Sequence, residues 1–337
     1  MGVCFCLAGN AGERTIAGEV GRAVLAEELG YNGIFISESL MSGFDPFQVM
    51  ALSAMRTRRI HLGTAIMTMS FREAAVVAQS AATLNEISNG RAVLGLGTGD
   101  GTTYTMGRTA TPLAVFEQGL RVIRDLVNGR PIHIPKGKER EEGELSLRAG
   151  RFPVPVYFAA AGPRSLRLAG RVADGVILGT GFDLRVLRWA REQIALGARE
   201  AGRSLSDIDL MGAGIMCVDE DRNRARELAR ARLANRAHHN FRFTMETIPP
   251  DELDAVKRFM ENFDVTKPVN QRSDPRLVTE YLLQRFSIAG TAEECVRRVQ
   301  QLEQAGIHRI LLTLPPLVYR DVMKRWAEKV MPHFSPG

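Results

Sequence analysis

The chain has 337 residues, a length that suits either two ordinary domains or one large α/β barrel. Hydrophobic residues make up 45% and charged residues 24%, as in soluble globular proteins, and no apolar run reaches the ~18 residues of a membrane span. The formal net charge is +6, and it is spread unevenly along the chain.

The N-terminus and the cysteines bear on where the protein works. Residues 1–10 lack a basic segment before a long apolar one, so the sequence predicts no signal peptide. No pair of cysteines shows metal-ligand spacing with histidines nearby. We therefore expect reduced core thiols, no bound metal and a cytoplasmic protein. The cysteines are Cys4, Cys6, Cys217 and Cys295.

Seven arginines between residues 222 and 242 concentrate positive charge in one segment. No aromatic residue interleaves with them before Phe241, so we expect no nucleic-acid partner, and no membrane partner either. The segment predicts a solvated helix face or a surface that attracts an anionic cofactor tail or substrate. A further hypothesis is a non-enzymatic binding protein whose basic segment recruits an acidic partner.

The first part of the chain alternates short apolar runs with segments of helical periodicity. The expected strands are 2–7, 33–37, 60–67 and 92–97, and the expected helices are 18–30, 45–55, 74–88 and 111–129. Asp45 is the expected N-cap of the second helix, with Pro46 in its first position. Thr111 is the expected cap of the fourth helix. Residues 101–110, after the fourth strand, show no helical pattern.

The second part resumes the same alternation after residues 130–150, whose alternating charges suit a hairpin or loop. The expected strands are 154–160, 175–179, 208–218 and 309–315, and the expected helices are 163–173, 183–201, 291–306 and 320–331. Residues 219–290 are too long for a plain connection, so they predict an insertion.

Eight buried strands that alternate with helices predict a parallel sheet covered on both faces. Eight such units favour a closed (β/α)₈ TIM barrel over residues 1–337 as one domain, with an insertion after strand seven. An open doubly wound sheet is the alternative, but the first strand lacks the phosphate-loop glycines of such folds. In a barrel, residues 219–290 would lie over the active site, as a lid, an oligomer contact or a passive excursion.

A glycine-rich stretch, GLGTGDG at residues 95–101, ends the fourth strand. The dinucleotide fingerprint is absent, because Asp100 and Thr102 stand where its last glycine would fall. At the mouth of a barrel, these glycines would let a flat ligand lie close to the backbone. The residues alone leave Asp100 as either a functional acid or a turn cap.

Small residues also precede the helix that follows strand five. Residues 159–162 are small and Pro163 opens the helix, so free N–H groups and the helix dipole predict an anion or phosphate site. Arg164 and Ser165 add a charge and a hydroxyl, and Thr180 follows strand six. A capped helix without a ligand is the alternative.

Three segments resemble the bacterial luciferase-like monooxygenase superfamily, most closely its branch that uses the deazaflavin coenzyme F420. They are LGTAIMTMSFREAAVVAQSAATLNEISNGRAVLGLGTGD (62–100), VPVYFAAAGPRSLRLAGRVADGVIL (154–178) and FSIAGTAEECVRRVQQLEQAGIHRILLTLP (286–315). The last is similar to the methylenetetrahydromethanopterin reductases of that branch. The resemblance implies a homodimeric F420H₂-dependent reductase that transfers a hydride to a C=C, C=N or C=O bond of a small molecule. An FMN-dependent monooxygenase is the alternative.

The resemblance also implies roles for individual residues. Ala65 and Ile66 match a bulge after strand three, often a non-proline cis peptide, that backs the deazaflavin ring. Glu38 matches an acidic position near the ring, and Asp100 matches an acid that donates a proton in relatives. We expect Asp100 and Glu38 to be catalytic. The other expected cofactor contacts, at strand three and around the phosphate, are Met67, Thr68, Ala160, Ala161, Gly162, Pro163, Arg164, Ser165 and Thr180.

Two departures from these relatives bear on the substrate. Ser39 stands where relatives that oxidise alcohols or sugars often have a histidine, which argues against alcohol oxidation. Cys6 lies near the place where methylenepterin reductases carry a glutamate, which argues against a methylenepterin substrate. The sequence therefore predicts no particular substrate.

Overall fold

The fold is seen in a computed structural model that describes most of the chain. The described residues are 2–9, 15–40, 43–99, 101–138, 141–148, 151–264, 267 and 272–334. For residues 102 and 105, only the backbone is described. Within these ranges, no helix combines the length and the apolar character needed to cross a membrane.

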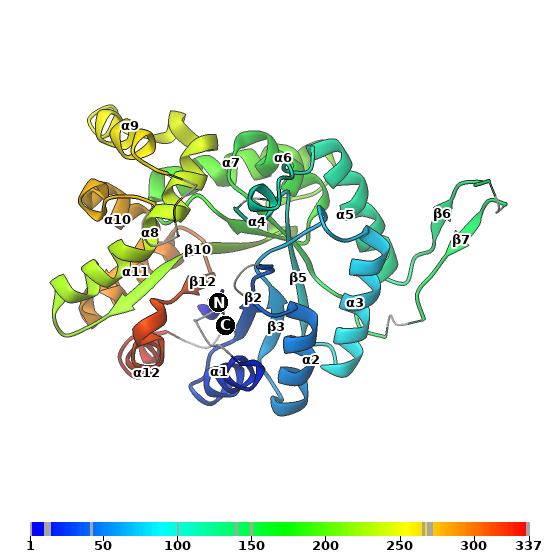
Figure 1. Cartoon of the computed structure of the whole chain (residues 1–337), viewed down its shortest axis with the longest axis horizontal. Coiled ribbons are helices and arrows are strands. Elements are labelled where there is room, and N and C mark those ends of the chain that lie inside the picture. Colours follow the sequence, from blue (N-terminus) through cyan, green and yellow to red (C-terminus); the bar gives the residue numbers. More distant parts are fainter. Residues whose placement is uncertain are drawn as a thin grey trace.

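Eight parallel strands close into a barrel, which confirms the expected (β/α)₈ fold (Figure 1). In order around the ring they are β1 (Cys4–Ala8), β2 (Gly33–Ile36), β3 (His61–Thr64), β5 (Ala92–Gly97), β8 (Val156–Ala160), β9 (Gly175–Leu178), β10 (Asp209–Val218) and β12 (Arg309–Thr313). The ring closes where β12 pairs with β1, with Arg309 opposite Cys4.

Eight helices lie outside the strands and cover the barrel (Figure 1). They are α1 (Ile16–Glu28), α2 (Pro46–Arg56), α3 (Ala74–Ile87), α5 (Leu113–Val127), α6 (Pro163–Val172), α7 (Leu184–Glu200), α11 (Ala292–Gln304) and α12 (Tyr319–Lys329). Asp45 caps α2 as expected, because its carboxylate accepts from the N–H groups of Phe47 and Gln48. The expected Thr111 cap is wrong: Pro112 occupies the N-cap of α5, and the Thr111 hydroxyl bonds to Ser70 instead.

The inside of the barrel is a packed core. Two large rings fill it, and a glycine on a neighbouring strand makes room for each of them. A Cβ at Gly63 would lie 2.4 Å from the Phe35 ring, and one at Gly175 would lie 2.3 Å from the Tyr157 ring. Because side chains fill the interior, a ligand must bind at the rim, where the strands end.

The segment after β10 adds structure to the basic barrel. It contains α8 (Arg222–Thr244), α9 (Leu253–Glu261), α10 (Glu280–Phe286) and the short strand β11 (Ser287–Gly290). β11 pairs with the last four residues of β10, outside the eight-strand ring. The helix α8 buries residues four apart, from Ala225 to Phe241, so it packs along its whole length.

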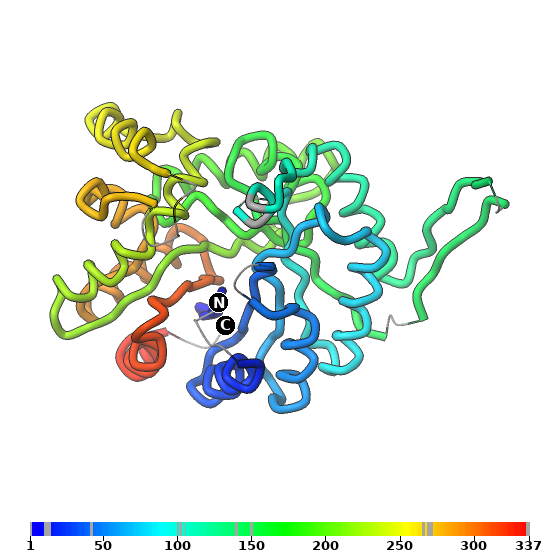
Figure 2. Tube along the Cα trace, viewed as in Figure 1, coloured from blue at the N-terminus to red at the C-terminus, as the bar shows by residue number. Residues whose placement is uncertain are grey.

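Two further elements differ in how well the sequence predicts them. The strands β6 (Ile132–Ile134) and β7 (Gly143–Leu145) form the expected hairpin, which projects from the body (Figure 2). The expectation that residues 101–110 are not helical is wrong, because α4 (Gly101–Thr105) follows β5. A helix of five residues is too short to show an apolar period.

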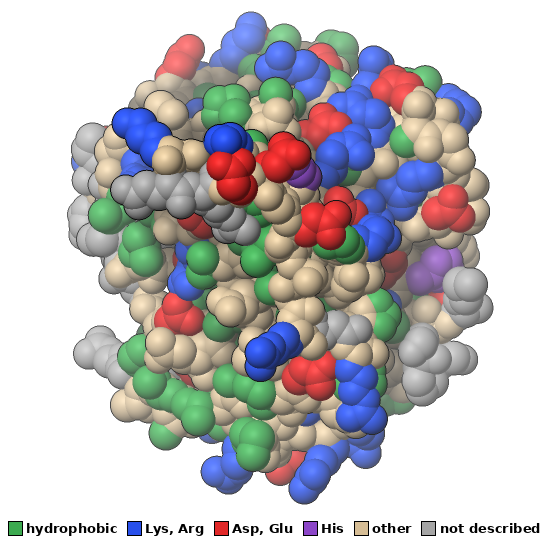
Figure 3. Space-filling model, turned by 90° about the vertical axis from the view of Figure 1, so that its right-hand side faces the viewer, with side chains coloured by type: hydrophobic (Ala, Val, Ile, Leu, Met, Phe, Trp, Pro, Cys, Tyr) green, Lys and Arg blue, Asp and Glu red, His purple; other side chains and the backbone are tan. Residues whose placement is uncertain are grey.

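The surface near the hairpin carries mixed charge. On the face seen in Figure 3, basic side chains lie beside acidic ones over the upper part, and hydrophobic side chains gather lower down.

Candidate active site

The expected third strand is interrupted at the barrel mouth. It divides into β3 and β4 (Met67–Thr68), which are joined by a cis peptide bond between Ala65 and Ile66. The expected bulge at these residues is therefore present. Strand β2 and the residues after it hold the bulge: Ser37 Oγ donates to Ala65 O over 2.6 Å, and Glu38 N donates to Ile66 O over 3.1 Å.

The glycines of β5 accommodate this bulge. A Cβ at Gly97 would lie 2.1 Å from Cδ1 of Ile66, and a Cβ at Gly95 would lie 2.1 Å from the Thr64 carbonyl oxygen. The Thr64 hydroxyl also bonds to both the N–H and the carbonyl of Gly95. The expectation that these two glycines leave room for a ligand is therefore wrong, since the protein itself fills the space beside them.

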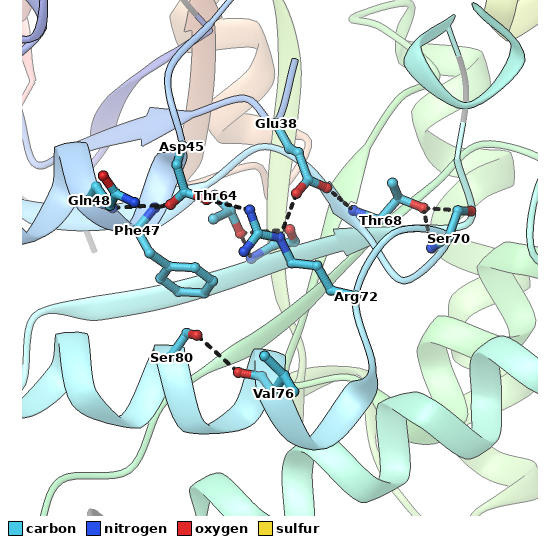
Figure 4. A network of polar contacts seen from close by, with 11 residues as sticks. Glu38, Asp45, Phe47, Gln48, Thr64, Thr68, Ser70, Arg72, Val76 and Ser80 are labelled. Carbon is cyan, nitrogen blue, oxygen red and sulfur yellow. Dashed lines mark hydrogen bonds and ion pairs between the residues drawn. The ribbon is translucent and has the colours of Figure 1, made fainter. Parts of the chain in front are cut away.

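Glu38 is buried in a network of charges beside the bulge (Figure 4). Its Oε1 accepts from Nε of Arg72 over 2.7 Å, and its Oε2 accepts from the N–H of Thr68 over 3.1 Å. Arg72 also pairs with Asp45 at 2.5 Å. Glu38 is only 8% exposed, and both of its oxygens are occupied. Its carboxylate thus holds β4 in place from one side of the bulge.

Sequence reasoning missed Arg72 and gave Asp45 only a capping role. Asp45 does cap α2, but its second oxygen neutralises Arg72. Beyond the charges, the hydroxyls of Thr68, Ser70 and Thr111 form a chain that links β4 to the start of α5. A single arginine after an apolar run carries no periodic signal, so nothing in the sequence pattern marks this network.

The predicted anion site lies at the ends of β8 and β9. No side chain caps α6, whose N-cap is Gly162, and Ser165 Oγ donates back to Gly162 O over 2.9 Å. The first N–H groups of an uncapped helix remain available to a ligand. Gly179 N donates to Ala160 O over 3.1 Å, so the residues predicted after strands five and six are neighbours.

Thr180 is the one predicted contact in this region with an unsatisfied hydroxyl. Its side chain is fully buried, and within the described residues Oγ1 has no hydrogen-bond partner. A buried hydroxyl without a partner is costly, and ligand binding is one way to satisfy it. Arg164, by contrast, is exposed at the start of α6.

The end of α8 reaches this region from the segment after β10. Asn240 Nδ2 donates to Gly179 O over 2.9 Å. A Cβ at Gly162 would lie 3.2 Å from Cβ of Phe243, and Arg242 lies over the Tyr104 ring of α4 at 5.0 Å. Residues of the predicted insertion therefore contact the ends of β8 and β9.

Carboxylates pair with several of the seven arginines between residues 222 and 242. Arg222 pairs with Glu294 at 2.9 Å and Arg230 pairs with Glu227 at 3.1 Å. Arg226 pairs with Glu280. These pairs neutralise part of the positive charge of the segment within the protein, and the Arg226 and Arg230 side chains are only 16% and 19% exposed.

The four cysteines are free and buried, as expected. Burial raises the pKa of Cys6 to about 12 and that of Cys217 to about 12, so neither forms a thiolate near neutral pH. The part of the chain that the structure describes holds no group of three or more His, Cys, Asp or Glu side chains suited to a metal.

The predicted proton donor, Asp100, lies outside the described residues. Its neighbours are Gly99, just after β5, and Gly101, the first residue of α4. Its position in the chain is thus the carboxyl end of a barrel strand, the edge at which barrel enzymes place catalytic groups.

Comparison with known proteins gives consistent matches over nearly the whole chain. The family described as luciferase-like monooxygenase matches residues 2–309. The chain is 30% identical over 298 residues to the 5,10-methylenetetrahydromethanopterin reductase of Methanolobus tindarius, which covers 87% of this chain and 89% of that relative. It is 29% identical over 327 residues to the F420-dependent glucose-6-phosphate dehydrogenase of Beutenbergia cavernae, covering 92% and 90%.

A solved structure shows the same fold. The coenzyme F420-dependent tetrahydromethanopterin reductase from Methanopyrus kandleri superposes with a TM-score of 0.78 at 24% identity, over 99% of this chain and 100% of that one.

Proposed function

The chain belongs to the luciferase-like monooxygenase family, and on that premise we propose that it is an oxidoreductase that uses the deazaflavin coenzyme F420. Two of the relatives named above carry F420 in their names, and they act on different substrates. This supports F420 over FMN as the cofactor. For the substrate, we propose a small molecule with a polarised C=C, C=N or C=O bond.

The observation that carries the proposal is the pair of unsatisfied groups at the ends of β8 and β9. Among the residues that the structure describes, no side chain caps the N-terminus of α6 and none bonds to the buried Thr180 hydroxyl. An anion such as a phosphate would satisfy both, and the dipole of α6 favours negative charge there. In this proposal Ala160, Ala161, Gly162, Pro163, Arg164, Ser165 and Thr180 surround the cofactor phosphate.

The other end of the cofactor would lie against the bulge between β3 and β4. Ala65 and Ile66, which are partly exposed, form this surface, and the protein holds it from behind through Ser37 and Glu38. The other two expected contacts, Met67 and Thr68, are buried, so they would support the surface from beneath. The bound deazaflavin supplies a ring carbon that takes up or releases a hydride.

Two acidic residues then have different roles. Glu38 positions the bulge, because Arg72 and Thr68 occupy both of its oxygens. Asp100 donates the proton that completes reduction of the substrate. A carboxylic acid is an effective donor near neutral pH only where a dry site keeps it protonated, which an apolar ring beside it would promote.

A titration with Thr180→Val tests the phosphate assignment. Valine keeps the shape of the side chain and removes the hydroxyl. We expect F420 to bind the variant about tenfold to a hundredfold more weakly, the effect of one hydrogen bond to a charged group. Thr103→Val, another buried threonine, is the control. Equal F420 affinity in Thr180→Val and the unchanged chain would contradict the assignment.

The proposal includes a cytoplasmic homodimer. The four buried free thiols suit a reducing compartment. A groove of about 640 Å³ between α1 and α2 is lined mostly by apolar residues, and Leu52 and Met55 beside it are 48% and 71% exposed. Light scattering tests the dimer: Met55→Glu should shift the mass from two chains to one, and a monomeric unchanged chain would contradict it.

A further inference from the structure

Arg285, in the last turn of α10, is an unusual buried charge. It is 1% exposed, and within the described residues no carboxylate lies within ion-pair distance of its guanidinium. A buried charge is costly unless hydrogen bonds compensate it. Its surroundings are therefore informative about what the guanidinium does.

The guanidinium is satisfied by neutral groups on three elements. Nε donates to the Thr180 carbonyl over 3.2 Å, and Nη1 donates to the Tyr281 hydroxyl over 2.8 Å. Nη2 donates to Oδ1 of Asn240 over 3.1 Å and to the Thr244 hydroxyl over 3.2 Å. Phe241 and Phe286 stack near the charge, at 4.9 and 5.3 Å.

Arg285 also orients Asn240. The amide oxygen of Asn240 accepts from Arg285 and from Thr244, so its nitrogen faces Gly179 and donates to that carbonyl. Two successive carbonyls of the loop after β9, those of Gly179 and Thr180, are thus bound from the side of α8 and α10.

The same residue fixes the end of that loop. The Arg285 carbonyl accepts from the N–H of Phe182 over 2.5 Å. Gly181 has a positive φ of +85°, and a Cβ there would lie 2.2 Å from the Arg285 carbonyl oxygen. The loop from Gly179 to Phe182 is therefore packed directly against α10.

The geometry of the peptide bond decides what the loop presents on its other side. In a trans peptide the N–H points opposite to the carbonyl. With the carbonyls of Gly179 and Thr180 turned toward Asn240 and Arg285, the N–H groups of Thr180 and Gly181 face away from them. The loop then presents donors, while its acceptor oxygens, which would repel an anion, are bound on the other side: that of Gly179 by the Asn240 amide and that of Thr180 by the Arg285 guanidinium.

We propose that Arg285 is a positioning residue for the cofactor phosphate, acting through Asn240 and the backbone of residues 179–182. The inference rests on the proposed function, because it concerns the same phosphate site. Arg285 does not touch the ligand; it sets which face of the loop the ligand meets.

The test compares two probes, F420 and the same deazaflavin with its ribityl chain but without the phosphate. Arg285→Lys keeps the charge but loses the fork that reaches both Thr180 and Asn240. We expect its dissociation constant for F420 to rise at least about tenfold, and that for the phosphate-free probe to change less than about twofold. If Arg285 were needed only for folding, its substitution would lower the affinity for both probes alike.

Two further variants control the test. Arg22→Lys alters a fully buried arginine of α1, which pairs with Glu19 at 2.8 Å, and should affect neither probe. Asn240→Asp keeps the oxygen toward Arg285 and removes the donor to Gly179, so it should weaken F420 selectively. It also carries the test if Arg285→Lys fails to fold.

The outcomes separate the two claims. Equal loss of both probes, or unchanged F420 affinity, in a folded Arg285→Lys or Asn240→Asp variant overturns the positioning role and leaves the proposed function standing. Failure of the unchanged chain to bind F420 overturns the proposed function and this inference with it.

Discussion

The two sides of the barrel mouth differ in whether their polar groups have partners within the protein. Beside β3 and β4, the charges of Glu38, Arg72 and Asp45 satisfy one another. At the ends of β8 and β9, the described part of the chain offers no side-chain cap to the N-terminus of α6 and no partner to the Thr180 hydroxyl. We call the first side complete, because the side chains of Glu38, Arg72 and Asp45 have partners within the protein, with two carboxylates to one arginine. We call the second side incomplete, because it has groups that a ligand would satisfy.

This difference implies a direction for the ligand that we propose. A neutral ring suits the complete side, because the polar groups there already have partners and the excess of carboxylates over arginine disfavours an anion. A phosphate suits the incomplete side, where unsatisfied donors face it. A molecule that spans both sides must therefore be flat and neutral at one end and anionic at the other. Substitutions that change one side at a time test this difference.

The largest effect is expected at Asp100, which follows β5 in the sequence. Asp100→Asn keeps the shape but cannot donate a proton. Single-turnover hydride transfer should slow by about 10²–10⁴-fold while F420 affinity changes little. If Asp100 is only a turn cap, Asp100→Asn should change neither the transfer rate nor the stability, because Asn caps as well as Asp. Asp100→Ala should then lower the free energy of unfolding by about 0.5–2 kcal/mol and leave the rate of the folded protein unchanged.

The next effect concerns the incomplete side. Gly162→Val places a branched side chain where a Cβ alone would lie 3.2 Å from Phe243. The variant should bind F420 about tenfold or more weakly, and its affinity for the phosphate-free deazaflavin should change far less. Gly137→Val is the matched control, since no atom lies within 4 Å of a Cβ built there. Equal loss for both ligands would show that Gly162 matters for packing and not for the phosphate.

On the complete side, the expected effect is on stability. Glu38→Gln removes the ion pair with Arg72, and we expect the free energy of unfolding to fall by about 1.5–3 kcal/mol in urea titrations. Asp45→Asn, which keeps the N-cap oxygen, should cost less. A variant of Glu38 with normal stability and a rate as low as that of Asp100→Asn would make Glu38 catalytic, and the contrast between the two acids would fail.

The smallest expected effect is the pH dependence of stability that His238, on α8, produces. Burial, with Arg242, His239 and Arg272 nearby, lowers the pKa of His238 to about 4. The ordinary value of an unfolded histidine is about 6.5, so between these values only the unfolded chain takes up the proton. Stability should therefore fall as the pH drops from about 6.5 toward 4.

Urea midpoints between pH 7 and pH 5 measure this dependence. His238→Phe keeps a ring against Phe263, which lies 3.9 Å away and nearly parallel, and should make the dependence shallower. An unchanged slope would mean that other groups control the pH response.

The barrel could be predicted from the sequence because its strands are apolar runs between amphipathic helices. Strand β9, GVIL, contains no polar residue, so it is recognised as a buried strand. Asp45 and Pro46 mark the start of α2. The small residues before Pro163 likewise predict a helix whose N-terminus has no side-chain cap. These signals are local, so a single sequence contains them.

The remaining features depend on contacts between distant residues. The break at Ala65–Ile66 lies inside an apolar run, where no period changes. Gly97 is explained only by Ile66, 31 positions earlier, and Arg285 only by Thr180 and Asn240. The site residues that sequence reasoning missed are arginines whose partners come from other elements.

The most direct test is a crystal structure of the chain with F420. The account predicts the phosphate within hydrogen-bond distance of the first N–H groups of α6 and of the Thr180 hydroxyl, with the ring against Ala65 and Ile66. A phosphate bound away from α6, or a ring that does not contact the β3–β4 bulge, would contradict it.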